Sequence, residues 1–261
     1  MKNTWVKRFV AAVLSLVLIF TVCSCASAEP SLIPADLEVG DEIELGMYPQ
    51  ESSNPNEMSP IIWVVSDISD GKAVLKSKYV LDFRPFDSDY SGVGTVDCEN
   101  SEIRQLLNNE FYNSAFSDEE REIIIQDTHI EVVYAYYLTE DGYYDESGTI
   151  EFEDYIYLFD PSIAEQALAT PYAVSRAKYY KPDDYANYEG WYPIEYMTSA
   201  LTLWKLEYDE YATGYWKIDE DGEFIMFDEG FFDYSGLPCP ITLDKASGIR
   251  PMMTIALDSD N

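Results

Sequence analysis

Apolar and polar positions alternate in the first part of the chain, and this pattern predicts paired strands. Residues 41–48 (DEIELGMY) alternate, residues 61–65 (IIWVV) form a buried run, and residues 73–81 (AVLKSKYVL) alternate again. Ser69, Asp70 and Gly71 lie between the last two, and glycine tolerates the positive φ that a tight turn requires. We therefore expect a strand followed by a β-hairpin.

The same pattern predicts further strands downstream. The turn residues 219–222 (DEDG) separate two of them and predict a second hairpin. The expected strands are residues 130–138, 155–159, 202–206, 215–218, 223–227 and a closing apolar strand in 248–257.

Two short helices are predicted between residues 98 and 125. Apolar residues recur at helical spacing in the first helix, which Asn100 or Ser101 can cap through a side-chain oxygen and which Asn113 ends. The second helix begins at Ser117, and Glu120 three residues later completes a capping box. The first helix places four apolar side chains on one face: Ile103, Leu106, Leu107 and Phe111.

Another helix is predicted over residues 163–169, where Asp160 is the cap and Pro161 the first helical residue, and a short helix or turn begins in 169–173. The acidic residues 141–154 and the Tyr- and Asp-rich residues 181–191 lack such signals and are expected to be surface loops. The whole pattern predicts an α+β fold with a mixed, mostly antiparallel sheet and two or more short helices.

The N-terminus has the pattern of a secretory signal. Three basic residues precede an apolar run over 9–22, and the small residues Ala26, Ser27 and Ala28 suit cleavage after Ala28. The run is shorter than the roughly 20 apolar residues that a spanning helix needs. The segment 22–25 (VCSC) also resembles a lipobox, in which Cys25 would be acylated. We expect an exported or membrane-anchored protein with a signal over 1–28, a tether over 29–40 and one domain over 41–258.

The charge is strongly negative. Cleavage after Ala28 would leave 13 Lys and Arg against 49 Asp and Glu, a formal charge of −36. Such a surface repels nucleic acid and anionic lipid. Disorder is not expected, because hydrophobic residues make up 47% of the chain and aromatic residues 15%.

Little in the sequence indicates catalysis. His129 is the only histidine, so multi-histidine zinc sites are excluded, and it is expected at the surface. Arg104 is interpreted as a structural ion pair. The acids are scattered rather than set at ligand spacing, so no cofactor is predicted, and bound Ca²⁺ has no supporting motif. Cys98 and Cys239 are either a disulfide or two buried thiols.

Binding is the alternative to catalysis. Trp191, Tyr192 and Tyr196 either pack on the domain or present their rings to a sugar. An enzyme acting through paired carboxylates remains a weaker alternative, because a chance pair is easy to nominate among 49 acids.

The central helical block and the closing strand resemble a bacterial domain of unknown function, numbered 6273. That family shows a tryptophan in an "IxW" strand, a "WxNSxxRxWLNxxFYxxAF" block and a closing "GxRP" motif. Here Cys98 stands at the first block tryptophan, Leu106 at the second, and the family's "WWLRS" strand is reduced to LWKL. The matching residues are Trp63, Asn100, Ser101, Arg104, Leu107, Asn108, Phe111, Tyr112, Ala115, Phe116, Gly248, Arg250 and Pro251.

The resemblance implies an exported domain with a fold similar to C-type lectins and formylglycine-generating enzymes. It assigns no activity. Together with the chain's own pattern it favours a non-catalytic binding module for a cell-envelope glycan or protein. A structural domain of a surface assembly is the alternative.

Overall fold

The computed structural model describes residues 32–89, 100–139, 142–158, 165–205, 211–225, 227–232, 238–240 and 243–257. The described residues from 36 to 257 belong to one compact unit. The expected signal and Cys25 lie outside the described residues, as does Cys98, so the disulfide stays a prediction. None of the described helices is long and apolar enough to cross a membrane.

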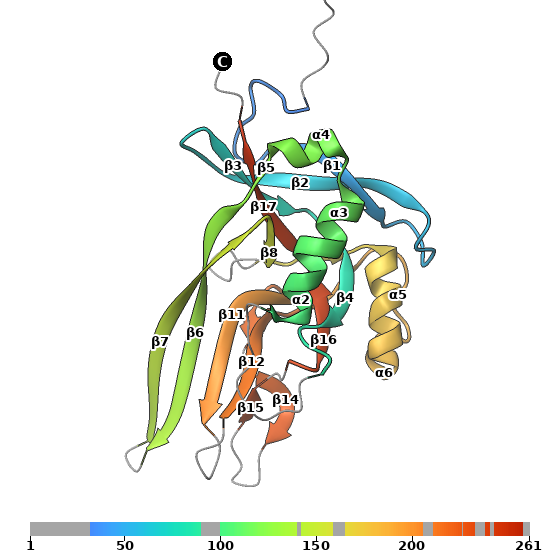
Figure 1. The fold of residues 1–261 in the computed structure, drawn as a ribbon. Coiled ribbons are helices and arrows are strands. Elements are labelled where there is room, and N and C mark those ends of the chain that lie inside the picture. The colour runs from blue at the N-terminus through green and yellow to red at the C-terminus, as the bar shows by residue number, and fades with distance from the viewer. Residues whose placement is uncertain are drawn as a thin grey trace, which may run out of the picture. The chain divides into compact units, whose positions relative to one another are not determined.

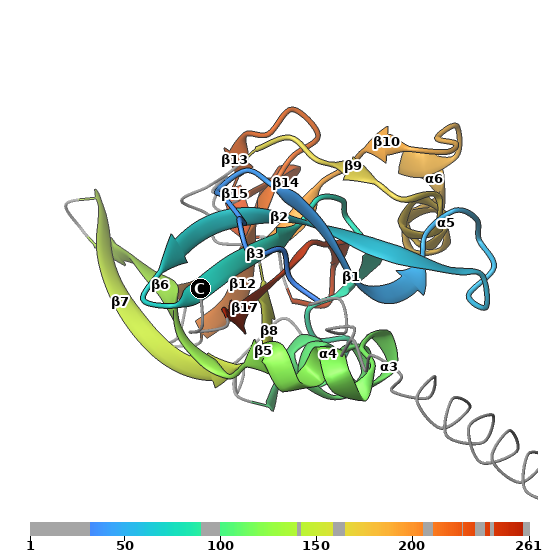
Figure 2. The same ribbon diagram turned by 90° about the horizontal axis from the view of Figure 1, so that it is seen from above.

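The described strands form two main sheets, shown in Figures 1 and 2. In the first sheet every pairing is antiparallel, and the last strand, β17, is the centre on which three other strands converge. Its members are β1 (Glu42–Pro49), β2 (Met58–Ser69), β3 (Lys72–Ser77), β17 (Pro251–Ala256), β5 (Ile124–Ile125) and β8 (Ile156–Leu158).

The second sheet is mixed, because β11 pairs in parallel with β16 and with β6. Its other pairings are antiparallel, among them the long β6–β7 hairpin of Figure 1. Its members are β13 (Phe224–Ile225), β12 (Tyr211–Ile218), β11 (Tyr196–Lys205), β16 (Ala246–Ile249), β4 (Asp82–Pro85), β6 (Asp127–Thr139) and β7 (Gly142–Asp154).

Two small sheets complete the strands. They are β9 (Leu168–Ala169) with β10 (Tyr192–Pro193), and β14 (Phe227–Phe232) with β15 (Pro238–Pro240). The fold class is therefore α+β with mostly antiparallel pairing, as the sequence predicts.

The helices are short. The helical block runs without a break through α2 (Glu102–Gln105), the π-helix η2 (Leu106–Phe111) and α3 (Tyr112–Ala115). It is followed by α4 (Asp118–Ile123), and later in the chain by α5 (Pro171–Tyr180) and α6 (Pro182–Tyr185). In Figure 1, α2 and α5 lie on either side of β4.

Both predicted hairpins are confirmed. β2 and β3 pair across Asp70 and Gly71, and Gly71 has a φ of +73°. β12 pairs with β13 across the 219–222 turn. Each hairpin combines a strand pattern with a glycine that permits a tight turn. Both signals are local, so the sequence alone predicts them.

The first helix differs from the prediction in two ways. It continues past Asn113 to Ala115. Ser101 occupies the cap position and its carbonyl accepts the first helical hydrogen bond from Gln105, but its side chain makes no capping bond. The second helix does have the predicted capping box between Ser117 and Glu120.

One predicted loop and one predicted helix are wrong in the described residues, and a second predicted loop is wrong in part. Residues 142–154 form β7, because thirteen residue pairs join it to β6 and override the low strand propensity of its acids. The segment 181–191 contains α6, which begins with Pro182 at a position where proline is favourable. Leu168–Ala169 is a strand rather than a helix end, while residues 159–164 lie outside the described part.

Candidate functional site

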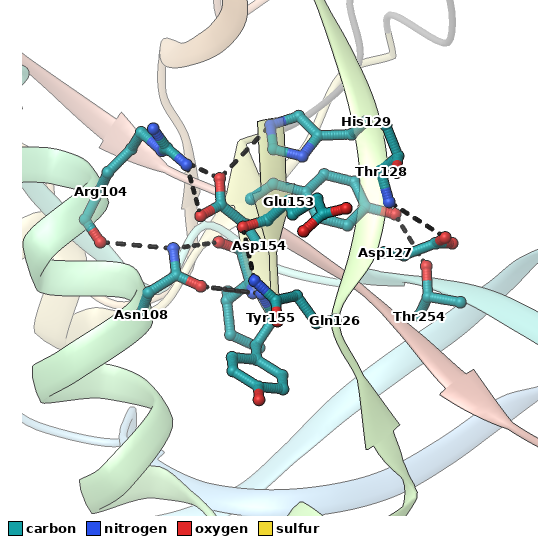
Figure 3. Close-up of polar contacts among 12 residues, drawn as sticks. Arg104, Asn108, Gln126, Asp127, Thr128, His129, Glu153, Asp154, Tyr155 and Thr254 are labelled. Carbon is teal, nitrogen blue, oxygen red and sulfur yellow. Dashed lines mark hydrogen bonds and ion pairs between the residues drawn. The ribbon is translucent and has the colours of Figure 1, made fainter. Parts of the chain in front are cut away.

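A buried ion pair joins the helical block to the end of β7. The Arg104 guanidinium donates from Nε to Asp154 Oδ2 at 2.9 Å and from Nη2 to Oδ1 at 2.7 Å (Figure 3). The two side chains are only 13% and 7% exposed. Arg104 also lies over the ring of Phe152, with 4.0 Å from its Cζ to the ring centroid. The predicted structural ion pair of Arg104 is therefore confirmed.

Asn108, one helical turn further on, holds the neighbouring strand β8. Its Nδ2 donates to the Ile156 carbonyl at 2.9 Å, and its Oδ1 accepts from the backbone N–H groups of Tyr155 and Ile156 at 2.9 and 3.1 Å (Figure 3). The amide thus bonds to backbone groups that would otherwise lack partners. This explains why the block needs an asparagine here.

His129 was expected at the surface, and that expectation is wrong. Its side chain is 10% exposed, and its Nε2 lies 3.6 Å from Asp154 Oδ2. The imidazole stacks on Tyr157, with ring centroids 4.7 Å apart and planes at 11°. Phe152 on the paired strand β7 and Tyr157 on β8 of the other sheet cover the ring, and local sequence reveals neither contact. Arg104 already donates to both oxygens of Asp154. We therefore interpret Arg104, Asp154 and His129 as a structural network.

Most of the remaining family residues are buried in the packing of the domain. Trp63 is fully buried and donates from Nε1 to the Leu45 carbonyl at 2.8 Å. Phe111 and Phe116 contact each other edge to face, with centroids 5.7 Å apart. Asn100 is exposed, whereas Ser101 and Pro251 are buried.

Arg250 lies where the chain passes from β16 in the second sheet to β17 in the first. It is 2% exposed and donates to the Ser77 carbonyl at 3.0 Å, the Tyr196 hydroxyl at 3.3 Å and Glu165 Oε1 at 2.6 Å. The motif's arginine therefore ties the crossing point to β3, β11 and residue 165.

An exposed group of aromatic rings is the best candidate for a binding surface. The Trp191 ring packs on Tyr79 with centroids 4.4 Å apart, and Tyr192 stacks on Tyr188 at 4.0 Å and 26°. Trp191 and Tyr192 are each 38% exposed. We call Tyr79, Tyr188, Trp191 and Tyr192 the aromatic surface. The two ring pairs are joined through the backbone, because Trp191 of one pair and Tyr192 of the other are neighbours in the sequence.

Tyr196 does not belong to the aromatic surface. It is 0% exposed, and its hydroxyl donates to the Glu165 carbonyl at 2.7 Å. Of the three residues proposed from sequence, two are exposed together and the third lies in the core. Burial raises the pKa of Tyr188, and the neighbouring Tyr192 adds to the effect.

Sequence reasoning missed Tyr79 and Tyr188 as members of this surface. Tyr79 follows β3 directly and comes from a part of the chain more than 100 residues before Trp191. Tyr188 was grouped with a loop, although it follows α6 and packs edge to face on Tyr185 at 5.1 Å. Only the clustering of tyrosines in 179–192 signalled the region.

A family model for a domain of unknown function, DUF6273, matches residues 70–257. The chain belongs to this family. No curated protein and no solved structure matches the chain. The DUF6273 match begins at the β2–β3 turn, so all of β1 and β2, including Trp63, precedes it.

The DUF6273 match contains the helical block, the aromatic surface and the closing motif. Arg104 and Asn108 of the block and Arg250 of the motif form hydrogen bonds that connect distant segments of the domain. The likeness to C-type lectins and formylglycine-generating enzymes stays a prediction.

Proposed function

We propose that this protein is an exported, non-catalytic module that binds a cell-envelope glycan through the aromatic surface. The observation that carries the proposal is the packing of two exposed rings on two half-buried ones, Trp191 on Tyr79 and Tyr192 on Tyr188. Such pairs hold their rings in place, so binding costs little side-chain entropy. Tryptophan and tyrosine are also the residues most enriched among those that dominate binding energy.

The surroundings favour a sugar ligand. The faces of aromatic rings can stack on the C–H groups of a sugar, while Asp183, Asp184 and Glu189 are exposed nearby in sequence and can accept hydrogen bonds from hydroxyl groups. The net charge of −33 disfavours anionic polymers. The expected ligand is therefore a neutral or amino-bearing polysaccharide.

A glycan array with neutral, amino-bearing and anionic members tests this proposal, with and without Ca²⁺. We expect binding to neutral or amino-bearing members, unchanged when Ca²⁺ is removed, because ring stacking needs no ion. Trp191→Ala should weaken binding by about thirtyfold, which corresponds to about 2 kcal/mol. Tyr179→Ala is the matched control, because Tyr179 is 74% exposed and is not part of the aromatic surface. Absence of binding to every member would contradict the glycan assignment.

Export rests on the N-terminal pattern of the sequence. Mass spectrometry of the protein purified from its own cells distinguishes the two routes. Cleavage before an acylated Cys25 and sensitivity to globomycin would establish the lipid anchor, and an unmodified N-terminus at Glu29 would establish simple secretion. A mature protein that retains residues 1–28 would contradict export by either route.

A further inference from the structure

A hollow lies between the helical block and β4, and none of the residues that line it belongs to the aromatic surface. Its empty volume is about 340 Å³, including the space open to solvent. The lining combines one cation, two acids and one amide with apolar side chains: Arg84, Glu102, Glu110, Gln105, Pro85, Ile103 and Leu106. A π-helix forms one wall, and π-helical turns occur frequently at functional sites.

Arg84 is held rigidly and still has donors to offer. Its Nε donates to Asp82 Oδ2 at 2.8 Å, and that carboxylate is only 3% exposed. Asp82 is fixed in turn by the Tyr48 hydroxyl at 3.0 Å and by Arg176 Nε at 3.3 Å. Within the described part of the chain, the two terminal nitrogens of Arg84 have no hydrogen-bond partner, and the side chain is 28% exposed. A guanidinium fixed through Nε presents its outer nitrogens to a ligand carboxylate.

Ser247 is the strand neighbour of Arg84 and has a buried hydroxyl without a partner in the described residues. It lies directly across from Arg84 in the antiparallel β4–β16 pair, so both side chains share one face of the sheet. Ser247 is 0% exposed, and its Oγ has no hydrogen-bond partner among the described residues. A buried hydroxyl without a partner is costly, but Ser247 is not among the residues that line the hollow, so the ligand contacts are argued from the lining residues alone.

The charged side chains around the hollow indicate which class of ligand fits it. Arg84 and Arg176 share the single carboxylate Asp82, which leaves one uncompensated positive charge on the β4 side. Glu110 on the π-helix and Glu102 on α2 put negative charge on the other side, where Glu102 already accepts from Ser88 at 2.6 Å. A ligand carrying only negative charge would meet these acids. A zwitterion matches both sides.

The apolar side chains in the lining narrow the class of ligand further. Ile103 and Leu106 supply an apolar contact beside the charged groups. A second hollow, which shares Leu106, is lined largely by apolar side chains that include Leu107 and Phe111. We propose that the hollow binds a free α-amino acid with an apolar side chain. Its carboxylate bonds to Arg84, its ammonium group faces Glu110, and its side chain lies against Leu106.

Isothermal titration of the whole secreted chain with L-leucine tests the proposal, and N-acetyl-leucine and leucinol serve as matched ligands. The first lacks the ammonium group and the second lacks the carboxylate. We expect saturable binding of leucine, and at least about tenfold weaker binding of both analogues, since each loses one charge-assisted contact. Failure of leucine, isoleucine, valine, methionine and phenylalanine to bind at millimolar concentration would overturn the proposal. Equal binding of N-acetyl-leucine would also overturn it by showing an anion site.

Variants locate the site. Glu110→Gln should weaken leucine binding by about tenfold and leave N-acetyl-leucine binding unchanged, because Glu110 faces only the ammonium group. Glu110 is exposed, so this variant keeps the fold, whereas Arg84→Gln also breaks the Asp82 contact. Glu119→Gln on α4 removes the same charge from an exposed position outside the hollow and should change nothing. If Glu110→Gln and Glu119→Gln behave alike, the assignment of the ammonium contact is wrong.

Discussion

Arg104, Asn108 and Arg250 each join segments that lie far apart in the sequence. Arg104 reaches 50 residues ahead to Asp154, Asn108 reaches 48 ahead to Ile156, and Arg250 reaches 173 back to Ser77. All three are long or amide side chains that can donate to several acceptors at once. The residues that mark the family are thus internal ties rather than an exposed site.

The Arg104–Asp154 pair gives a stability prediction. Arg104→Met should lower the free energy of unfolding by roughly 3–5 kcal/mol, because it leaves the Asp154 carboxylate buried beside apolar rings without its partner. Urea unfolding followed by far-UV circular dichroism measures the change. The double variant with Asp154→Leu should lose less than the two single variants together, since no charge is then left unpaired. Wild-type stability of Arg104→Met would contradict the assigned role.

Gly248 is required by close packing. A Cβ atom there would lie 2.4 Å from the Glu195 carbonyl oxygen and 2.6 Å from a Val80 methyl carbon. Gly248→Ala should therefore cost about 3 kcal/mol of folding free energy. Gly71→Ala is the comparison, because nothing lies within 4 Å of its Cβ position and only its positive φ opposes alanine, at about 1 kcal/mol. Thermal denaturation should rank the two in that order, and the reverse order would contradict the packing argument.

At the scale of elements, α4 is fixed by its first turn. Glu120 accepts from the Ser117 backbone at 2.7 Å with one oxygen and from the Gly46 backbone at 2.7 Å with the other. The capping box therefore also attaches α4 to β1. The sequence therefore shows the capping box but not the tertiary contact that the same glutamate makes with Gly46.

This double use of Glu120 predicts unequal effects of two substitutions. Ser117→Ala should cost about 1 kcal/mol, the usual value of a lost N-cap. Glu120→Ala should cost more, because the Gly46 N–H also loses its acceptor. Chemical denaturation of both variants provides the test, with the exposed Glu119→Ala as a control for charge and helix propensity. Equal losses for Ser117→Ala and Glu120→Ala would show that the Gly46 contact contributes nothing.

The elements also show where sequence reasoning succeeds and fails. The β2–β3 hairpin and the Ser117 cap were predictable because turn and cap chemistry is local. β7 was missed because its strand character comes from pairing with β6, although Ile150 and Phe152 do alternate with Glu151 and Glu153. The π-helix gives no known local signal, and the hollow beside it forms only where β4 and the helical block come together in the fold.

For the whole molecule, three carboxylates couple stability to pH. Burial opposes ionisation of Glu195, but Lys181 and Lys217 prevail and hold its pKa below the usual range. Burial likewise opposes ionisation of Glu165 and Asp127, and their Lys and Arg partners again lower the pKa. A carboxylate whose pKa is lowered in the folded state stabilises that state. Its full contribution is present at pH values above the unfolded pKa of about 4. That contribution is lost as the pH falls through the lower, folded value.

Urea unfolding midpoints should therefore fall between pH 5 and pH 3, even though acid also reduces the net negative charge. Glu195→Gln should flatten this pH dependence, because the glutamine cannot titrate. It should also lower stability at pH 7, since Lys181 and Lys217 lose their shared carboxylate. The exposed Glu223→Gln is the control and should retain the wild-type slope. A Glu195→Gln profile that matches the wild-type profile would contradict the coupling.

The function proposed for the whole molecule depends on the aromatic surface. The most direct measurement is affinity electrophoresis of the mature chain through gels that contain polysaccharide from its own cell envelope. The account predicts that the wild-type chain and Tyr179→Ala are retarded equally, and that the Trp191→Ala, Tyr192→Ala double variant migrates as in a gel without polysaccharide. Equal retardation of the double variant and the wild-type chain would contradict it.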